Sequence, residues 1–186
     1  MARAISQNAW LRRLGWALWI LVIGLVASAA GLLSRTYHLP VQLSWGFRGS
    51  ILPLPLTFST VGLLITSRLP RHRIGWLFHA TGLGFGVQTL AEEYAIYALI
   101  AHPGALPAGE FAAWIDNWIW ITSFSPALLA LLLFPDGRLL SRRWRLAAGI
   151  LALGAAGLTL QYTLKSGPMQ SSFPIDNPYT LIRGFG

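Results

Sequence analysis

The sequence contains no cysteine, and charged residues make up only 11% of its 186 positions. Without cysteine the chain can form no disulfide, no thiolate metal site and no cysteine nucleophile. Soluble domains carry about 25% charged residues, so a globule of this composition would lack the charge to cover a water-exposed surface. Intrinsic disorder is excluded as well, because 54% of the residues are hydrophobic.

Motifs of common catalytic and cofactor sites are also missing from the sequence. G-x-S-x-G, Walker A and H-E-x-x-H do not occur. The histidines are His38, His72, His79 and His102, and their spacing matches neither a metal site nor a pair that would hold haem between helices. We therefore expect no metal and no cofactor. The sequence assigns no catalytic residue, which leaves open whether the protein is an enzyme.

Long apolar runs are what the sequence has instead. A helix needs about 20 apolar residues to cross the hydrocarbon core of a bilayer. Five segments qualify as candidates, at about 14–33, 51–67, 74–100, 114–134 and 146–164. The second is the weakest, because Pro53 and Pro55 lie in its first turn, although proline is tolerated there. The runs predict an all-α, polytopic integral membrane protein with about five transmembrane helices and a membrane domain over 14–164.

The positions of the charges predict an orientation. Ten of the fourteen basic residues, but only one of the six acids, lie before the first run or in the connections after the second and fourth runs. The arginines of these two connections are Arg68, Arg71, Arg73, Arg138, Arg142, Arg143 and Arg145. By the positive-inside rule, residues 1–13 form a basic cytoplasmic N-terminus and residues 165–186 form an extracytoplasmic tail. The net charge of +8 thus indicates orientation and lipid headgroup contacts, and we expect no nucleic-acid partner.

The first run also has features of a secretory signal peptide. Arg12 and Arg13 precede it, and Ala27-Ser28-Ala29 is a small-residue pattern of the kind that is cleaved. However, the run continues through Leu33, and further apolar runs follow it. We therefore expect this segment to be retained as a membrane anchor.

Ionisable residues near the outer ends of two runs are the main candidates for ligand binding. Glu92 and Glu93 lie about 27 Å along a helix from Ile74, which places them at the outer interface. If the third and fourth runs are neighbours, an acidic pocket rimmed by aromatic residues forms there, suited to a cation, a cationic peptide or an amphiphile. The candidate residues are Glu92, Glu93, Tyr97, Trp114, Asp116, Asn117 and Trp118. The alternative is that they are ordinary interfacial residues and helix caps.

Two features inside the runs have more than one interpretation. Pro126 removes a backbone hydrogen bond to Thr122 and predicts a kink, which is either a hinge for signalling or a packing device. Gly82 and Gly86 form a G-x-x-x-G pattern, which permits close helix packing either within the chain or in a dimer.

Several stretches resemble a known family. They are RLPRHRIGWL at 68–77, YAIYAL at 94–99, PGALP at 103–107, AWIDNW at 113–118, LFPDGRL at 133–139 and SRRWR at 141–145. The first resembles a basic loop that ends in an Asn-Pro-Ile-Gly-Trp-type helix start, the next three an outer hairpin, and the last two a second inner loop. Together they resemble the N-terminal membrane region of bacterial two-component sensor histidine kinases.

The resemblance implies a multi-pass sensory or input module in the bacterial inner membrane, with a second copy of the chain or a kinase as its partner. The family's phosphoacceptor helix, Asn-rich ATP box and glycine-rich lid are not in this chain, and His72 lies in a loop too short to replace the helix. We therefore expect either part of a longer kinase or a stand-alone membrane relative, without catalysis of its own. From the residues alone, the alternative is a small transporter or ion-conducting protein that uses Glu92, Glu93 and Asp116.

Overall fold

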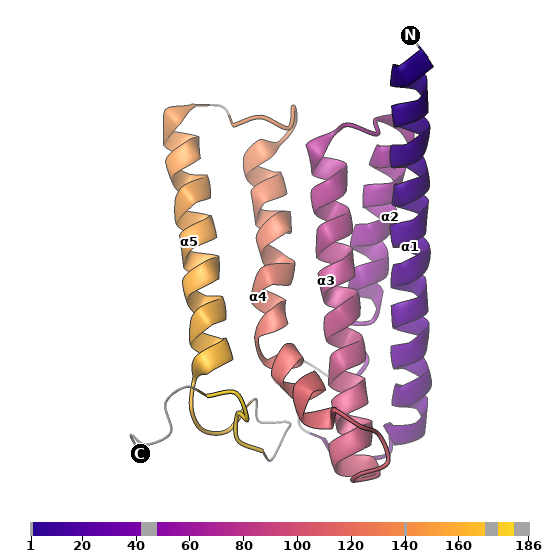
Figure 1. The fold of residues 1–186 in the computed structure, drawn as a ribbon, viewed down its shortest axis with the longest axis vertical. Coiled ribbons are helices and arrows are strands. Elements are labelled where there is room, and N and C mark those ends of the chain that lie inside the picture. The colour runs from indigo at the N-terminus through magenta and orange to yellow at the C-terminus, as the bar shows by residue number, and fades with distance from the viewer. Residues whose placement is uncertain (1, 42–47, 140, 170–174, 181–186) are drawn as a thin grey trace.

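The computed structural model describes residues 2–41, 48–139, 141–169 and 175–180. Within these residues the chain forms five α-helices and one π-helical turn. They are α1 (Ala2–Thr36), α2 (Pro53–Arg68), α3 (Arg73–Ala95), η1 (Ile96–Ala101), α4 (Gly109–Leu133) and α5 (Arg142–Leu164). Consecutive α-helices run in opposite directions along the long axis (Figure 1). The predicted all-helical class is confirmed for the described residues.

The helix bounds follow from where the sequence interrupts helical geometry. The first glycine is Gly15 and the first proline is Pro40, so nothing breaks the helix before the first apolar run, and α1 begins at Ala2 rather than near residue 14. Proline fits the first turn of a helix, and α2 begins at Pro53. It ends at Arg68, shortly before Pro70.

Three of the five helices are long and apolar enough to cross a membrane by themselves, namely α1 from Asn8, α4 and α5. The other two candidates differ for physical reasons. Helix α2 has only 16 residues, and α3 buries polar side chains such as His79 and Gln88 against its neighbours. The structure therefore supports a membrane protein, while the count of five spans stays a prediction.

The outward surfaces of α1 and α5 are strongly apolar. Their exposed large side chains include Trp16, Ile20, Leu21, Leu146, Ile150, Leu153 and Leu160. No residue of α5 is buried within the structure. Contiguous apolar surface of this kind is unfavourable in water and favourable against lipid.

Helix α3 lies in the middle of the bundle, between α4 on one side and α1 and α2 on the other (Figure 1). Three glycines allow these approaches. A Cβ atom at Gly82 would lie 2.7 Å from the Ser59 backbone nitrogen in α2, and one at Gly86 would lie 3.2 Å from Leu25 in α1. A Cβ atom at Gly84 would lie 2.4 Å from the Oγ of a serine in α4. The G-x-x-x-G pattern is thus used for packing within the chain.

Replacing Gly82 tests this packing. We expect Gly82→Ala to lower the free energy of unfolding by about 1–3 kcal/mol, because the added methyl group overlaps backbone atoms of α2 that cannot rotate away. Gly149→Ala is the matched control, since no atom lies within 4 Å of that position and alanine favours the helix. Denaturant-induced unfolding in detergent, followed by circular dichroism, measures both. Equal stability of the two variants would contradict the central position of α3.

Candidate functional site

A buried ion pair joins the connection after α1 to the end of α3. Arg48 is 8% exposed and Glu93 is 3% exposed, and Arg48 Nη2 lies 2.5 Å from Glu93 Oε2. The same nitrogen donates to Thr36 Oγ1 at 2.8 Å, and Nη1 donates to the Thr36 carbonyl. The guanidinium therefore binds the C-terminal end of α1 and a carboxylate of α3 simultaneously. A cation is favoured at such a helix end, where the carbonyl groups concentrate negative charge.

Two further acids lie beside this ion pair. Asp116 of α4 is 2% exposed, and the side chains of Gln88, Glu92 and Glu93 interact with it. We call Arg48, Gln88, Glu92, Glu93 and Asp116 the polar centre. Among the described residues it contains three carboxylates and one guanidinium. Burying ionisable groups is costly unless they are compensated where they lie, so this concentration of acids is the main candidate for a functional site.

The polar centre also contains atoms without a hydrogen-bond partner. Gln88 is 4% exposed, and its Oε1 accepts no hydrogen bond, while Arg48 Nε donates none. Buried polar atoms usually have partners, so these two atoms are a further reason to regard the polar centre as a candidate site. Among the described residues, no group of three or more Asp, Glu or His side chains is arranged to hold a metal ion.

A largely apolar groove of about 260 Å³ adjoins the polar centre between α3, α4 and the start of α2. Its lining residues are Ser50, Ile51, Leu54, Phe85, Gln88, Trp120 and Phe124. Phe85 and Phe124 meet edge to face at 4.7 Å between ring centres. The sequence reasoning missed Gln88, because it considered only ionisable groups. Its position four residues before Glu92, on the same helix face, was the available signal.

The aromatic part of the predicted pocket lies elsewhere. Asn117 Nδ2 donates to the Tyr162 carbonyl at 3.0 Å, and Trp114 Nε1 donates to the Thr163 carbonyl at 3.2 Å, so both side chains face α5. Trp114 also packs against Trp118, with 5.5 Å between ring centres. Trp114 and Asn117 therefore belong to the α4–α5 contact, with Trp118 beside Trp114, whereas the three carboxylates meet in the polar centre.

Tyr97 belongs to neither group. It lies in the π-helical turn, and its ring centre is 4.9 Å from that of His102. The seven predicted site residues are therefore divided among three places.

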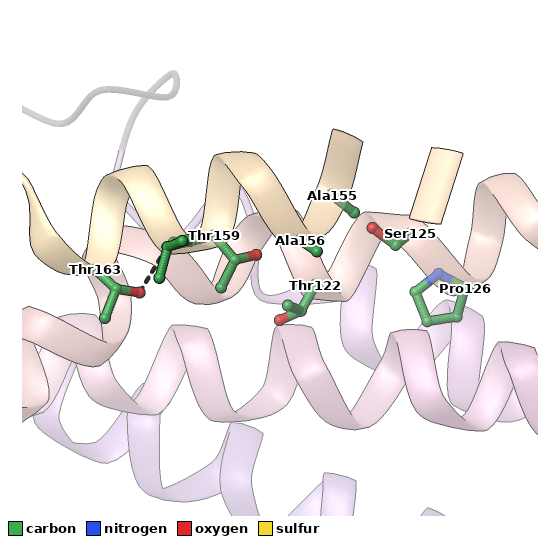
Figure 2. Close-up of a pocket in the computed structure, with 8 residues that line it drawn as sticks. Thr122, Ser125, Pro126, Ala155, Ala156, Thr159 and Thr163 are labelled. Atoms are coloured by element: carbon green, nitrogen blue, oxygen red, sulfur yellow. Dashed lines mark hydrogen bonds between the residues drawn. The ribbon is translucent and has the colours of Figure 1, made fainter. Parts of the chain in front are cut away.

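Pro126 faces α5 across an open groove of about 500 Å³ (Figure 2). Across from it lie the small residues Ala155 and Ala156, so the helices are not tightly interlocked at the proline. Nearby hydroxyl groups return to their own helix, as in the 2.7 Å hydrogen bond from Ser125 Oγ to the Ile121 carbonyl. Figure 1 shows the first turns of α4 tilted away from the rest of the helix. The position is compatible with the predicted hinge, which stays a prediction.

The predicted basic connections lie together at the end of the bundle that also holds the N-terminus (Figure 1). Their arginines are all exposed, namely Arg68, Arg71, Arg73, Arg138, Arg142, Arg143 and Arg145. The polar centre lies toward the opposite end, at the C-terminal ends of α1 and α3. Arg183, which the sequence places on the outer side, lies outside the described residues.

A second buried polar contact involves His79 of α3. Its Nε2 lies 3.2 Å from Thr66 Oγ1 and its Nδ1 lies 3.5 Å from Ser59 Oγ, both in α2. The three side chains are almost fully buried, and the backbone of Gly62 packs against the ring. This arrangement satisfies a histidine in the helix interface and joins α2 to α3.

Breaking the ion pair tests the polar centre. We expect Arg48→Met to lower the free energy of unfolding by about 3–5 kcal/mol, because Glu93 is then buried without a counter-charge. Adding Glu93→Gln to that variant should restore part of the loss, and a double-mutant cycle by thermal or denaturant unfolding measures the coupling. The control is Arg35→Met, an exposed arginine at the same end of α1. If both single arginine variants lose equal stability, the buried pair is not what holds this end of the bundle together.

Comparison with known proteins adds no family assignment. No family model, curated protein or solved structure matches this chain.

Proposed function

We propose that this chain is a membrane-embedded sensory module without catalysis of its own, in which five helices cross the bilayer. In this proposal the N-terminus is cytoplasmic and the tail after α5 is extracytoplasmic, in a bacterial inner membrane. The observation that carries it is the division of the bundle into two ends. Helices α3 and α4 contribute Glu93 and Asp116 to the polar centre, and their opposite ends adjoin the exposed arginines.

The orientation is supported by the arginine distribution, since basic residues in short connections favour the cytoplasmic side. Helix α2 is too short and α3 is too polar to qualify as a span by length and composition alone. Their polar residues nevertheless face protein rather than lipid, as Thr66 and His79 do. Polar groups that face the interior of a bundle are compatible with a membrane span. At 1.5 Å per residue, α2 covers about 24 Å, which is enough for most of the hydrocarbon core.

A signal would pass along α3 and α4. A ligand can shift an equilibrium only through different contacts in the two states, and the polar centre is where such contacts would change. Helix α5 is hydrogen-bonded to α4 near its outer end through Trp114 and Asn117, while the groove at Pro126 leaves room for relative movement. The receiving partner is a cytoplasmic kinase or a second copy of the chain, as the resemblance to sensor kinases implies.

A small transporter or ion-conducting protein is the second candidate. The specific observation in its favour is that Glu92, Glu93 and Asp116 meet at one place, because acids inside membranes often mark ion or proton pathways. A transporter would move ions across the bilayer, whereas a sensory module would change the conformation of its cytoplasmic connections.

Cysteine labelling tests the five-span topology without background, because the natural chain has no cysteine. We expect His38→Cys, Ala105→Cys and Ser166→Cys to react with a membrane-impermeant maleimide in intact cells. Leu69→Cys and Ser141→Cys should react only after the cells are opened. All five positions are exposed in the structure. Labelling of positions 38 and 69 from the same side would show that α2 does not cross.

A flux measurement separates the two functions. In liposomes with an imposed potential, we expect the sensory module to conduct protons no faster than protein-free liposomes, and Glu92→Gln to change nothing. A transporter would give flux that disappears in Glu92→Gln but persists in Glu110→Gln, an exposed acid at the same end. The second pattern, recorded with a pH-sensitive dye, would overturn the sensory proposal.

A further inference from the structure

The two basic connections contact each other at the end of the bundle that holds the N-terminus (Figure 1). Gly137, in the connection after α4, lies against the first residue of α3. A Cβ atom at Gly137 would be 3.8 Å from the Cβ of Arg73 and 3.9 Å from its backbone nitrogen. Two positions later, Leu139 packs against the buried cluster that includes Ile74. Arg138 thus lies between two residues that are fixed against the start of α3, and its chain position is next to that of Arg73.

Neither of these two arginines has a counter-charge within the part of the chain that the structure describes. Arg73 and Arg138 are exposed and form no ion pair there, and Asp136, the acid of the same connection, is exposed and forms none either. Helices α3 and α5 begin at this end without an acid in their first turns, so their positive dipole ends add to the potential. Neighbouring guanidinium groups repel each other, and an anion that contacts both removes that repulsion.

The same connections carry large apolar side chains on their surface, which indicates where that anion comes from. Leu69 is 58% exposed, Phe134 is 67% exposed and Trp144 is 41% exposed. In a membrane protein, arginines beside exposed aliphatic and aromatic side chains lie where hydrocarbon meets the phosphate groups of the lipid. A phospholipid would contact both kinds of side chain at once, whereas a soluble anion would use the arginines alone.

We propose that Arg73 and Arg138 together bind the phosphate of one anionic phospholipid, with its acyl chains against the exposed apolar side chains at this end. General attraction between basic connections and lipid headgroups depends on total charge and makes all the arginines equivalent. The site proposed here depends on the two that Gly137 brings together. It requires that the chain lies in a membrane, but it is independent of the sensory function and goes beyond it.

The experiment compares two lipids that differ in headgroup charge. The full chain in detergent is titrated with phosphatidylglycerol or with phosphatidylcholine of the same acyl chains. Native mass spectrometry counts the bound lipids and gives the dissociation constant of the first one. We expect the first phosphatidylglycerol to bind about tenfold more tightly than the first phosphatidylcholine, because only its headgroup carries a net negative charge.

Two double variants that remove equal charge locate the site. Arg73→Gln with Arg138→Gln should weaken phosphatidylglycerol binding roughly 10- to 100-fold, the usual effect of losing hydrogen bonds to a charged group, and should leave phosphatidylcholine binding unchanged. Arg12→Gln with Arg13→Gln is the matched control, because both arginines are exposed in α1 at the same end of the bundle. We expect the control to change phosphatidylglycerol binding by less than about threefold, and circular dichroism checks that both variants are folded.

Equal weakening in the two double variants would overturn the proposal, because the lipid would then respond only to total charge. The assignment to a lipid is tested by competition at constant ionic strength. We expect neither inorganic phosphate nor poly-glutamate to displace phosphatidylglycerol. Displacement by phosphate would show a site for a soluble anion, and displacement by poly-glutamate would show a surface for an acidic protein segment. Either result would overturn the lipid assignment.

Discussion

The buried ion pair between Arg48 and Glu93 is the interaction on which the end of the bundle at the C-termini of α1 and α3 depends. In a low-dielectric interior, an unpaired guanidinium or carboxylate is strongly destabilising. Arg48 avoids this by binding Glu93 of α3 and the Thr36 carbonyl at the end of α1. This contact fixes the connection after α1 against the C-terminal end of α3. Asp116 and Gln88 are then enclosed beside it, and a polar centre forms where a simple apolar bundle would have none.

Close packing around α3 makes that arrangement possible. Gly82, Gly84 and Gly86 let α2, α4 and α1 approach the same helix from three sides. The bundle therefore has a firm part, made of α1 to α4, and a looser fifth helix. Helix α5 buries no residue and meets α4 across the groove at Pro126, so it is the element that can most easily shift relative to the rest. This division suits a module that detects at one end and reports at the other.

Much of this fold follows from the sequence in simple physical terms. The apolar runs give the helices, Pro53 marks the start of α2, and the arginine-rich connections gather at one end because consecutive helices alternate in direction. The extent of α1 was predicted less well, since a run of apolar residues shows where lipid begins and not where a helix must stop. Asp116 faces the polar centre whereas Asn117 faces α5, because adjacent residues of a helix lie about 100° apart around its axis. Both were site candidates because they lie near the same end of one apolar run.

The buried ion pair of Arg48 could not be predicted from the sequence. Arg48 lies in the connection between the first and second apolar runs, and nothing in the neighbouring sequence distinguishes an arginine exposed in a loop from one folded inward against a distant glutamate. Its partner lies 45 positions away, and such a contact depends on how the helices pack. Gln88 was not predicted for a related reason. An uncharged amide indicates a site only when its surroundings are known to be buried and acidic.

The proposal that most needs a test is that the polar centre and the basic connections at the opposite end of the bundle belong to one two-state element. The most direct measurement is the distance distribution between spin labels at Leu69→Cys and Ser141→Cys, by pulsed electron paramagnetic resonance in nanodiscs, with and without Glu93→Gln in the polar centre. The labelled positions lie in the two basic connections, at the end of the bundle that holds the N-terminus (Figure 1). We expect Glu93→Gln to change the distribution, and Glu110→Gln, a change at an exposed acid, to leave it unaltered. An unaltered distribution in a folded Glu93→Gln protein would contradict the coupling of the two ends.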